Sequence, residues 1–247
     1  MLRFLGIKVP VLKNITIYYT GYAFTLTPAK VGEGMRSRYL KDEFGTPVAK
    51  SLPTVLSERY YDLIGVLVII FLTAVLTNGS FMTYVGMIFL VFFFIAVRRK
   101  VALKILAPLN KIRRTQKVYH SLLESVDVLE TLLRWRIFVQ SSLLTVLAWA
   151  FESAGASLVF EGFHLNLGLL RGAFDYVTTS FAGGITLLPG GVGGTEASLL
   201  GLLILQGHSY NDVVSAVLMV RFFALWYAIM IGIVFTAIHK KFRVGVA

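Results

Sequence analysis

The sequence predicts an all-α, polytopic integral membrane protein with two repeats of inverted topology, and three observations lead to this prediction. Of the 247 residues, 56% are hydrophobic, and several apolar runs approach the length that spans a bilayer core. Lysine and arginine gather on some of the connections between these runs and are missing from others. Two stretches about 160 residues apart also repeat one another, which is typical of transporter folds.

The repeated unit consists of a short apolar segment, a Pro/Gly break, a second short segment and a long helix with an arginine near its start. The break Pro28-Ala-Lys-Val-Gly-Glu33 resembles Pro189-Gly-Gly-Val-Gly-Gly-Thr-Glu196. Gly45 precedes Arg59 by 14 positions, and Gly207 precedes Arg221 by the same 14 positions. We expect each unit to be a re-entrant, Pro/Gly-broken hairpin followed by a long transmembrane helix, with repeat one at about 14–80 and repeat two at about 137–240.

The apolar runs predict the following elements in chain order: a short segment Ile15–Thr27, a helix from about Pro53 to Thr77, helices over Phe81–Val97, Ile137–Phe160 and Val213–Ile238, and a hairpin over Leu167–Gln206. The second limb of that hairpin, Glu196–Gln206, is long enough for about half a bilayer. The stretch at about 98–136 is too polar to span, so we expect amphipathic helices on the cytoplasmic surface, broken near Pro108. Residues 1–247 form a single membrane domain in this interpretation.

The distribution of basic residues predicts the orientation. Arg98–Lys100 and the C-terminal His239–Arg243 are basic, whereas Glu161–Asn166 and Gly207–Asp212 contain no lysine or arginine. By the positive-inside rule we expect a protein of the cell membrane with a cytoplasmic C-terminus. This path places Arg59 near the inner end of an outward helix and Arg221 in the outer third of an inward helix, so the two repeats are expected to be inverted.

Several function classes are disfavoured by the residue inventory. The chain has no cysteine, and its four histidines include no pair at metal-ligand spacing, so we expect neither a metal nor a cofactor. A net charge of +11 raises the possibility of nucleic-acid binding, but the basic residues flank apolar helices and are better explained by membrane orientation. No metal, nucleotide or nucleophile motif is found, so an enzyme is less favoured than a carrier.

Charged residues within the apolar segments are the candidate functional residues, and each has two interpretations. Arg59 and Arg221 are either structural ion-pair partners or contacts for an anionic headgroup in a central cavity. Asp62, three positions after Arg59, would then be its local partner. Glu33 and Glu196 either stabilise helix N-termini or serve as proton or cation sites.

The roles of the glycines in the second break and of one further acidic residue also have more than one interpretation. The N–H groups of Gly190, Gly191 and Gly193 could bind a phosphate, or these glycines could permit close helix packing. Glu152 lies in mid-span, where an uncompensated carboxylate is costly, and we expect an arginine partner from another helix.

Three segments together resemble one known family: Pro28–Arg36, Ser57–Asp62 and Pro189–Ala197. They are similar to the flippase-like membrane family, also called UPF0104 or the lysylphosphatidylglycerol synthase transmembrane-domain family, and the resemblance extends from about Leu5 onward. By position, it implies functional roles for Gly32, Glu33, Arg36, Glu58, Arg59, Asp62, Pro189, Gly190, Gly191, Gly193 and Glu196.

The resemblance implies a polytopic membrane domain that handles lipid. In the best-understood relative it implies translocation of aminoacylated phospholipid, and other relatives are tied to prenyl-linked sugar pathways. Members normally begin with one or two further helices, and we expect this chain to be without them and without the soluble aminoacyl-transfer domain of the synthase. Aminoacylation itself is therefore not implied.

The expected function is a lipid flippase or a transporter of phospholipid or polyprenyl-phosphate-linked intermediates, with membrane lipids as partners. The arginines would attract the phosphate, and Glu58, Asp62 and Glu152, together with Glu33 and Glu196, would carry protons or form ion pairs. Two alternatives remain: an integral-membrane transferase acting on prenyl phosphate or phospholipid, and an accessory subunit of an unlinked lipid-modifying enzyme.

Overall fold

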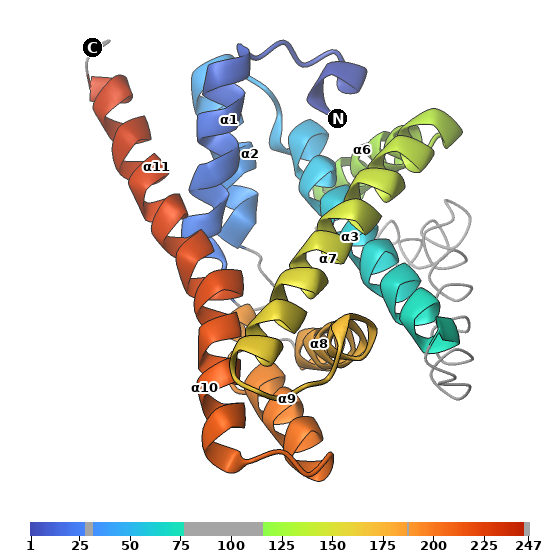
Figure 1. Ribbon diagram of the computed structural model, residues 1–247. Coiled ribbons are helices and arrows are strands. Elements are labelled where there is room, and N and C mark those ends of the chain that lie inside the picture. The colour runs from blue at the N-terminus through green and yellow to red at the C-terminus, as the bar shows by residue number, and fades with distance from the viewer. Residues whose placement is uncertain (28–31, 77–115, 187, 245–247) are drawn as a thin grey trace.

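The computed structural model describes residues 1–27, 32–76, 116–186 and 188–244, and over these ranges the chain is helical without a β-strand (Figure 1). The all-α prediction is thereby confirmed for the described residues. The predicted helix Phe81–Val97, the predicted break near Pro108 and residues Pro28 to Val31 of the first motif lie outside them.

The first unit consists of two short helices followed by one long helix. Its elements are the short turn η1 (Leu2–Leu5), α1 (Val11–Thr20), the 3-10 turn η2 (Gly21–Phe24), α2 (Met35–Phe44) and α3 (Val48–Leu76). Pro10 immediately precedes α1, and its fixed φ of −56° suits a helix start. The helix is interrupted at residues 25–27, just before the first break, of which residues 28–31 lie outside the described ranges.

Helix α3 starts earlier than the sequence suggested. Pro53 was expected near the first residue, but the helix begins at Val48 and Pro53 lies inside it. A proline has no N–H to donate to the carbonyl four residues before it, here that of Ala49. The Ser125 hydroxyl donates a hydrogen bond to the Ala49 carbonyl at 3.2 Å. A neighbouring helix, α6 (Gln116–Leu132), thus supplies the bond that the proline removes.

The second unit has the same order of elements after one additional long helix. Its elements are α7 (Trp135–Gly162), α8 (Leu169–Ile185), the turn η5 (Pro189–Gly191), α9 (Gly194–Leu205), α10 (Tyr210–Arg221), the π-helical turn η6 (Phe222–Trp226) and α11 (Tyr227–Val244). The sequence predicted one uninterrupted helix over Val213–Ile238. The π turn inserts an extra residue into that helix directly after Arg221, and no local pattern indicated it.

Glycines in the left-handed backbone region end the second short helix of both units. Gly45 follows α2 with φ 64°, and Gly207 follows α9 with φ 90°. These two glycines are the ones that the sequence comparison had paired. Because a residue with a Cβ is strained at such φ values, glycine is favoured at both positions.

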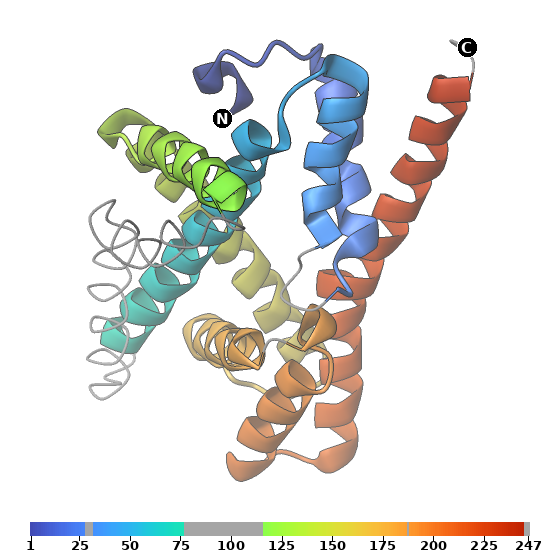
Figure 2. The same ribbon diagram turned by 180° about the vertical axis from the view of Figure 1, so that it is seen from behind.

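The two units pack against each other in a reciprocal way. The first hairpin helix of unit two, α8, packs on α3, the long helix of unit one (Figures 1 and 2). The first hairpin helix of unit one, α1, packs with η2 on α11 of unit two. The approach of α11 to η2 is very close, because a Cβ on Gly232 would lie 2.1 Å from the Ala23 nitrogen. Each hairpin is therefore supported by the long helix of the other unit.

The main apolar core lies where α3, α7, α8, α9 and α10 meet. Ile70, Phe160, Val177, Leu199 and Val217 each contribute to it and are buried. Helix α7 crosses α3 and also packs on α8, so it joins the two units (Figure 1). Burial of these side chains is the main source of stability for this arrangement.

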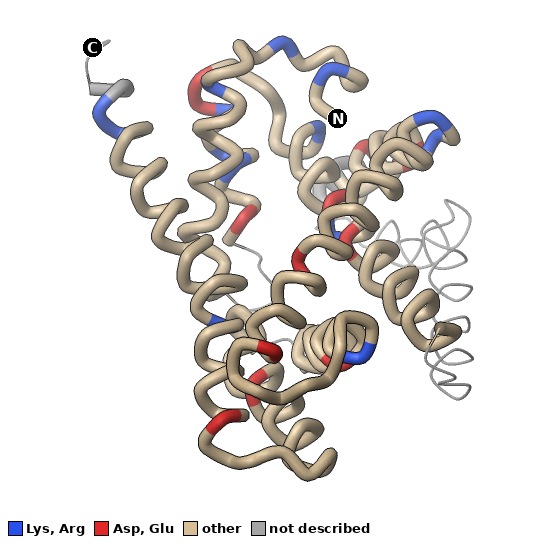
Figure 3. The backbone as a smooth tube through the Cα atoms, viewed as in Figure 1, with Lys and Arg blue, Asp and Glu red and all other residues tan. Residues whose placement is uncertain are grey.

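Three helices among the described residues are long and apolar enough to cross a membrane: Val48–Leu76, Trp135–Gly162 and Tyr210–Lys241. Much of their apolar surface is exposed, as with Leu144 and Phe151 on α7. Among the described residues, lysine and arginine gather toward the end of the molecule where both termini lie (Figure 3). This combination is that of a membrane protein.

Candidate functional site

Glu196 and Arg221 form an ion pair at the broken segment of unit two. Glu196 lies in the first turn of α9, where its Oε2 accepts a hydrogen bond from the Gly193 N–H at 2.8 Å. Its Oε1 accepts a hydrogen bond from Arg221 Nε at 2.7 Å. The glutamate therefore stabilises the helix N-terminus, as one interpretation expected, and also holds an arginine.

Arg221 is 8% exposed and makes a second contact with the same turn. Its Nη2 donates to the carbonyl oxygen of Gly190 at 3.0 Å. Gly190 has φ 60°, a left-handed backbone conformation that is strained for residues with a Cβ. Glycine is therefore favoured at the position whose carbonyl accepts this hydrogen bond. Arg221, the last residue of α10, is thus joined by two hydrogen bonds to Glu196 and to the turn between α8 and α9.

The glycines of this turn are used for hydrogen bonding within the turn and for close packing. The Gly191 N–H donates to the Leu188 carbonyl, and the Gly193 N–H donates to Glu196. A Cβ on Gly183 of α8 would lie 2.0 Å from the Thr195 hydroxyl and 2.7 Å from the Thr195 backbone nitrogen. Close approach of α8 and α9 therefore depends on Gly183, which the sequence analysis did not single out.

A buried acid joins the far ends of the same hairpin. Asp175 of α8 is fully buried and accepts a hydrogen bond from the Gln206 side-chain nitrogen at 2.9 Å. Arg171, one turn earlier in α8, lies 3.1 Å from the same carboxylate. Gln206 directly follows α9, so this contact holds the end of the second limb against the beginning of the first.

Glu33 and Arg59 form the corresponding ion pair in unit one. Arg59 Nη2 lies 3.3 Å from Glu33 Oε2, and the glutamate side chain is only 4% exposed. Arg59 Nη1 lies 3.0 Å from Asp62 Oδ2, which is the i,i+3 contact expected from the sequence. The Arg59 side chain is 32% exposed, more than that of Arg221.

A second arginine of unit one is held by Glu58. Arg36 of α2 donates two hydrogen bonds to the Glu58 carboxylate, at 2.6 and 3.1 Å, in the bidentate geometry that arginine favours. Its guanidinium also lies 4.3 Å from the ring centre of Tyr18. The resemblance had marked both Arg36 and Glu58, but it did not pair them. Gly32, marked in the same way, donates its N–H to the Thr27 hydroxyl at 2.7 Å.

The two ion pairs occupy equivalent places in their units. In each, a glutamate just after the break pairs with an arginine in the long helix that follows. The sequence comparison had placed Glu33 opposite Glu196 and Arg59 opposite Arg221, but it had not paired glutamate with arginine. Two residues about 25 positions apart give no local signal of contact, so the folded chain was needed to reveal the pairs.

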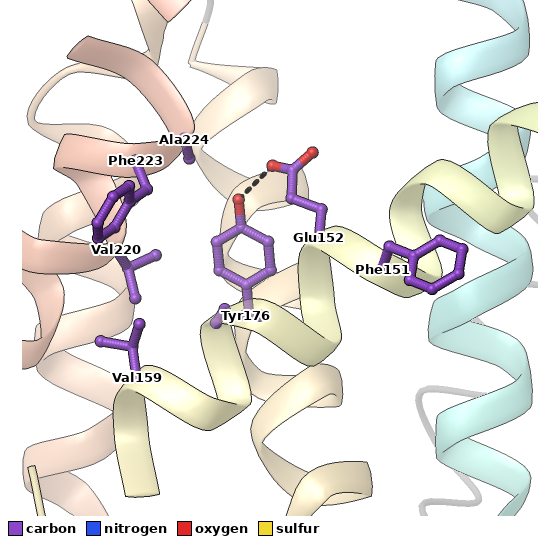
Figure 4. Close-up of a pocket in the computed structure, with 9 residues that line it drawn as sticks. Phe151, Glu152, Val159, Tyr176, Val220, Phe223 and Ala224 are labelled. Atoms are coloured by element: carbon purple, nitrogen blue, oxygen red, sulfur yellow. Dashed lines mark hydrogen bonds between the residues drawn. The ribbon is translucent and has the colours of Figure 1, made fainter. Parts of the chain in front are cut away.

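A cavity of about 380 Å³ lies beside the ion pair of unit two. Its lining comes from α7, α8 and the junction of α10 with η6, and comprises Phe151, Glu152, Gly155, Ala156, Val159, Tyr176, Val220, Phe223 and Ala224 (Figure 4). Most of these side chains are apolar, and Phe151 and Phe223 are exposed. The cavity therefore opens at the apolar surface of the helices.

Glu152 is the acid of this cavity. It was expected to pair with an arginine, and its Oε1 accepts a hydrogen bond from the Tyr176 hydroxyl at 2.6 Å (Figure 4). Tyr176 was not among the candidate residues, because a tyrosine in an apolar helix is usually explained by packing. The hydrogen bond gives the carboxylate a neutral partner within the bilayer-spanning part of the molecule.

The described residues contain no group of three or more histidine, aspartate or glutamate side chains that could hold a metal ion. The charged site is therefore built from arginine–carboxylate pairs, a phenol–carboxylate pair and backbone groups of one glycine-rich turn. Such groups can bind phosphate, take up protons or exchange one partner for another.

Comparisons with known proteins agree with this architecture. Residues 1–232 match the family model described as the lysylphosphatidylglycerol synthase TM region. The chain is also 24% identical over 233 residues to the UPF0104 membrane protein MJ1078 of Methanocaldococcus jannaschii, which covers 88% of this chain and 94% of that relative. No solved structure matches the chain. The chain belongs to the family of the lysylphosphatidylglycerol synthase transmembrane region.

Proposed function

We propose that this protein carries the phosphate-bearing headgroup of a lipid, either a phospholipid or a polyprenyl-phosphate-linked intermediate, across the cell membrane. The observation that carries the proposal is the recurrence of one device at equivalent places in two units: a glutamate–arginine pair beside a helix break, in which one of the two side chains is buried. A carrier with alternating access needs two related gates, and inverted repeats supply them. The family's name, which refers to the membrane region of a phospholipid synthase, is consistent with a lipid substrate.

The packing supports the inverted arrangement. Helix α8 packs on α3, and α1 packs on α11, so each hairpin rests on the opposite long helix, as a pseudo-two-fold axis would require. Helix α9 has 12 residues, which corresponds to roughly 18 Å or half a bilayer, so α8 and α9 suit a re-entrant hairpin. The gathering of lysine and arginine at the end with both termini favours a cytoplasmic C-terminus (Figure 3).

In this mechanism the lipid tails stay in the bilayer and the headgroup passes along the polar residues between the units. The phosphate contacts an arginine, the group best suited to bind a phosphate with two parallel hydrogen bonds. The cavity beside Glu152 and Tyr176 opens at an apolar surface, so tail atoms can remain against Phe151 and Phe223. A passive or gradient-driven process is expected, since the sequence contains no nucleotide-binding motif.

The test uses purified protein in liposomes that contain a fluorescent short-chain phosphatidylglycerol or polyprenyl phosphate. A membrane-impermeant quencher destroys the outer-leaflet signal, and translocation appears as loss of the protected inner signal. We expect translocation by the native chain and its loss in Arg59→Ala, with protein-free liposomes as the baseline. Failure to move either lipid class would contradict the proposal.

The same preparation distinguishes the two alternatives. An integral-membrane transferase would form a modified lipid that mass spectrometry detects, and Glu196→Gln would abolish its formation. An accessory subunit would show neither transport nor product, and its capture of an enzyme would survive Arg59→Ala and Arg221→Ala. Each result replaces the carrier proposal with a defined role.

A further inference from the structure

The two arginines differ in their hydrogen bonds: Arg59 has an N–H without an acceptor among the described residues, whereas Arg221 is bonded to Glu196 and to the turn before α9. The Nε of Arg59 is buried and has no hydrogen-bond partner among the described residues. In Arg221 the equivalent Nε donates to Glu196, and Nη2 donates to the Gly190 carbonyl. A buried N–H without an acceptor is costly, and an arriving acceptor atom removes that cost. Arg59 is therefore the arginine prepared to take a ligand.

The charges around Arg59 nevertheless oppose an anion. We call Arg36, Arg59, Glu33, Glu58 and Asp62 the unit-one cluster. Contacts of 2.6 to 3.3 Å join Arg36 to Glu58 and Arg59 to Glu33 and Asp62, and the two sets interact electrostatically. The tyrosines beside it, Tyr18 and Tyr22, are neutral; Tyr18 contacts Arg36, and Tyr22 interacts with Arg59 and Glu33. Two arginines and three carboxylates give the unit-one cluster a net formal charge of −1, and the Met1 amino group, which interacts with Glu58, balances it when protonated. A lipid phosphate that simply joined the cluster would add an uncompensated negative charge in a low-dielectric site.

The three carboxylates differ in how they can respond. Glu58 is held by two hydrogen bonds from Arg36, and Asp62 is 39% exposed and can remain hydrated. Glu33 is 4% exposed in its side chain, and Arg59 is its ion-pair partner at 3.3 Å. A buried carboxylate that loses its cation is so unfavourable that it binds a proton instead.

From this geometry we infer that a lipid phosphate displaces Glu33 from Arg59, and that Glu33 takes up one proton as it is released. The ion pair between Arg59 and Glu33 breaks, the phosphate oxygens accept hydrogen bonds from Nε and Nη2 of Arg59, and a proton from water binds a Glu33 oxygen. No covalent bond of the lipid changes. The inference rests on the proposed function and names its coupling ion.

Exchange of this kind has a clear electrical consequence. A phosphodiester headgroup brings one negative charge and the proton brings one positive charge, so the loaded cluster keeps the charge of the empty one. Transport then responds to a pH difference across the membrane and hardly responds to voltage. Unit two lacks this response in the described conformation, because Glu196 also accepts the Gly193 N–H and keeps a partner if its arginine leaves.

The experiment counts protons during binding in detergent. Short-chain phosphatidylglycerol is titrated into the purified chain by calorimetry, in two buffers of different ionisation enthalpy at the same pH. We expect uptake of about one proton per lipid bound by the native chain. Lipid binding without proton uptake would overturn the inference while leaving the carrier proposal intact, whereas absence of both binding and translocation would overturn the carrier proposal.

Glu33→Gln distinguishes exchange from a structural role. The amide imitates the protonated acid, so Arg59 is released in advance, and we expect lipid binding roughly fivefold tighter with no proton uptake. Glu124→Gln, a change at an exposed carboxylate outside the candidate site, is the control and is expected to keep uptake of about one proton. Weaker lipid binding by Glu33→Gln would show that Glu33 only supports the fold, and loss of proton uptake in Glu196→Gln alone would place the exchange in unit two; either result overturns the inference.

Discussion

The ion pairs Glu33–Arg59 and Glu196–Arg221 have the same sequence plan but differ in their contacts. In unit two the arginine is 10% exposed in its side chain and also bonds a backbone carbonyl of the turn. In unit one the arginine is 32% exposed, shares its guanidinium with Asp62 and leaves its Nε without an acceptor among the described residues. The comparison teaches that the pair of unit two holds a turn together, while the arginine of unit one keeps an N–H that a further acceptor can use.

The surroundings of the two arginines differ in the same sense. Glu58 and Asp62 flank Arg59, whereas Val220 and Ala224 stand at the matching positions around Arg221. Those two apolar residues line the cavity, so the second unit has space where the first has an acidic network. In an inverted repeat, the opposite-facing state would exchange these two geometries between the units.

The largest expected effect is on the free energy of unfolding, which Arg221→Ala should lower more than Arg59→Ala. Arg221→Ala leaves the Glu196 carboxylate and the Gly190 carbonyl without their buried partner, and we expect it to lower the free energy of unfolding by about 3 kcal/mol. Arg59→Ala removes an arginine that is 32% exposed but leaves the buried Glu33 without its cation, so it should lower the free energy of unfolding by about 2 kcal/mol. Unfolding of both variants in detergent, followed by circular dichroism, measures the difference. Equal losses would mean that the two ion pairs contribute equally to the free energy of unfolding.

An intermediate effect is expected from the glycines that bring α8 close to α9. Gly183→Ala places a methyl group 2.0 Å from the Thr195 hydroxyl and 2.8 Å from its Cα, so the helices must separate. We expect a loss of about 2 kcal/mol in unfolding free energy, and lower lipid translocation because the Arg221 contacts shift. Gly184→Ala is the matched control, because its Cβ would meet nothing within 4 Å. If both variants unfold at the same temperature, the close approach does not hold the hairpin.

The smallest expected effect concerns a feature that both units share, a glycine with positive φ after the second short helix. Gly45→Ala and Gly207→Ala each put a Cβ into a left-handed backbone conformation, with no neighbouring atom within 4 Å. Each should cost about 1 kcal/mol through backbone strain alone. Unfolding midpoints of the two variants, compared with the native chain, are expected to shift by similar amounts. A much larger shift for one of them would show that these turns are not equivalent.

Local patterns predicted the helical elements to a large extent. The run Ile137–Phe160 lies within α7, and the two breaks fall between the short helices as expected. The Arg59–Asp62 contact followed from helical spacing. The start of α3 was predicted too late because Pro53 was expected near its first residue. In the structure the Ser125 hydroxyl of α6 donates to the Ala49 carbonyl, which Pro53 cannot do. The π turn after Arg221 likewise arises from packing and leaves no periodic signal.

The sequence by itself determined that this chain is an all-α membrane protein and predicted two repeats in it, since hydrophobic length, charge placement and repeated glycines act locally. Only the tertiary structure decided that Glu33 pairs with Arg59, that Arg36 pairs with Glu58, and that Tyr176 bonds Glu152. These contacts join different helices or turns, and their geometry depends on where the helices cross. Helix crossings are fixed by the packing of many side chains together, which no single stretch of sequence encodes.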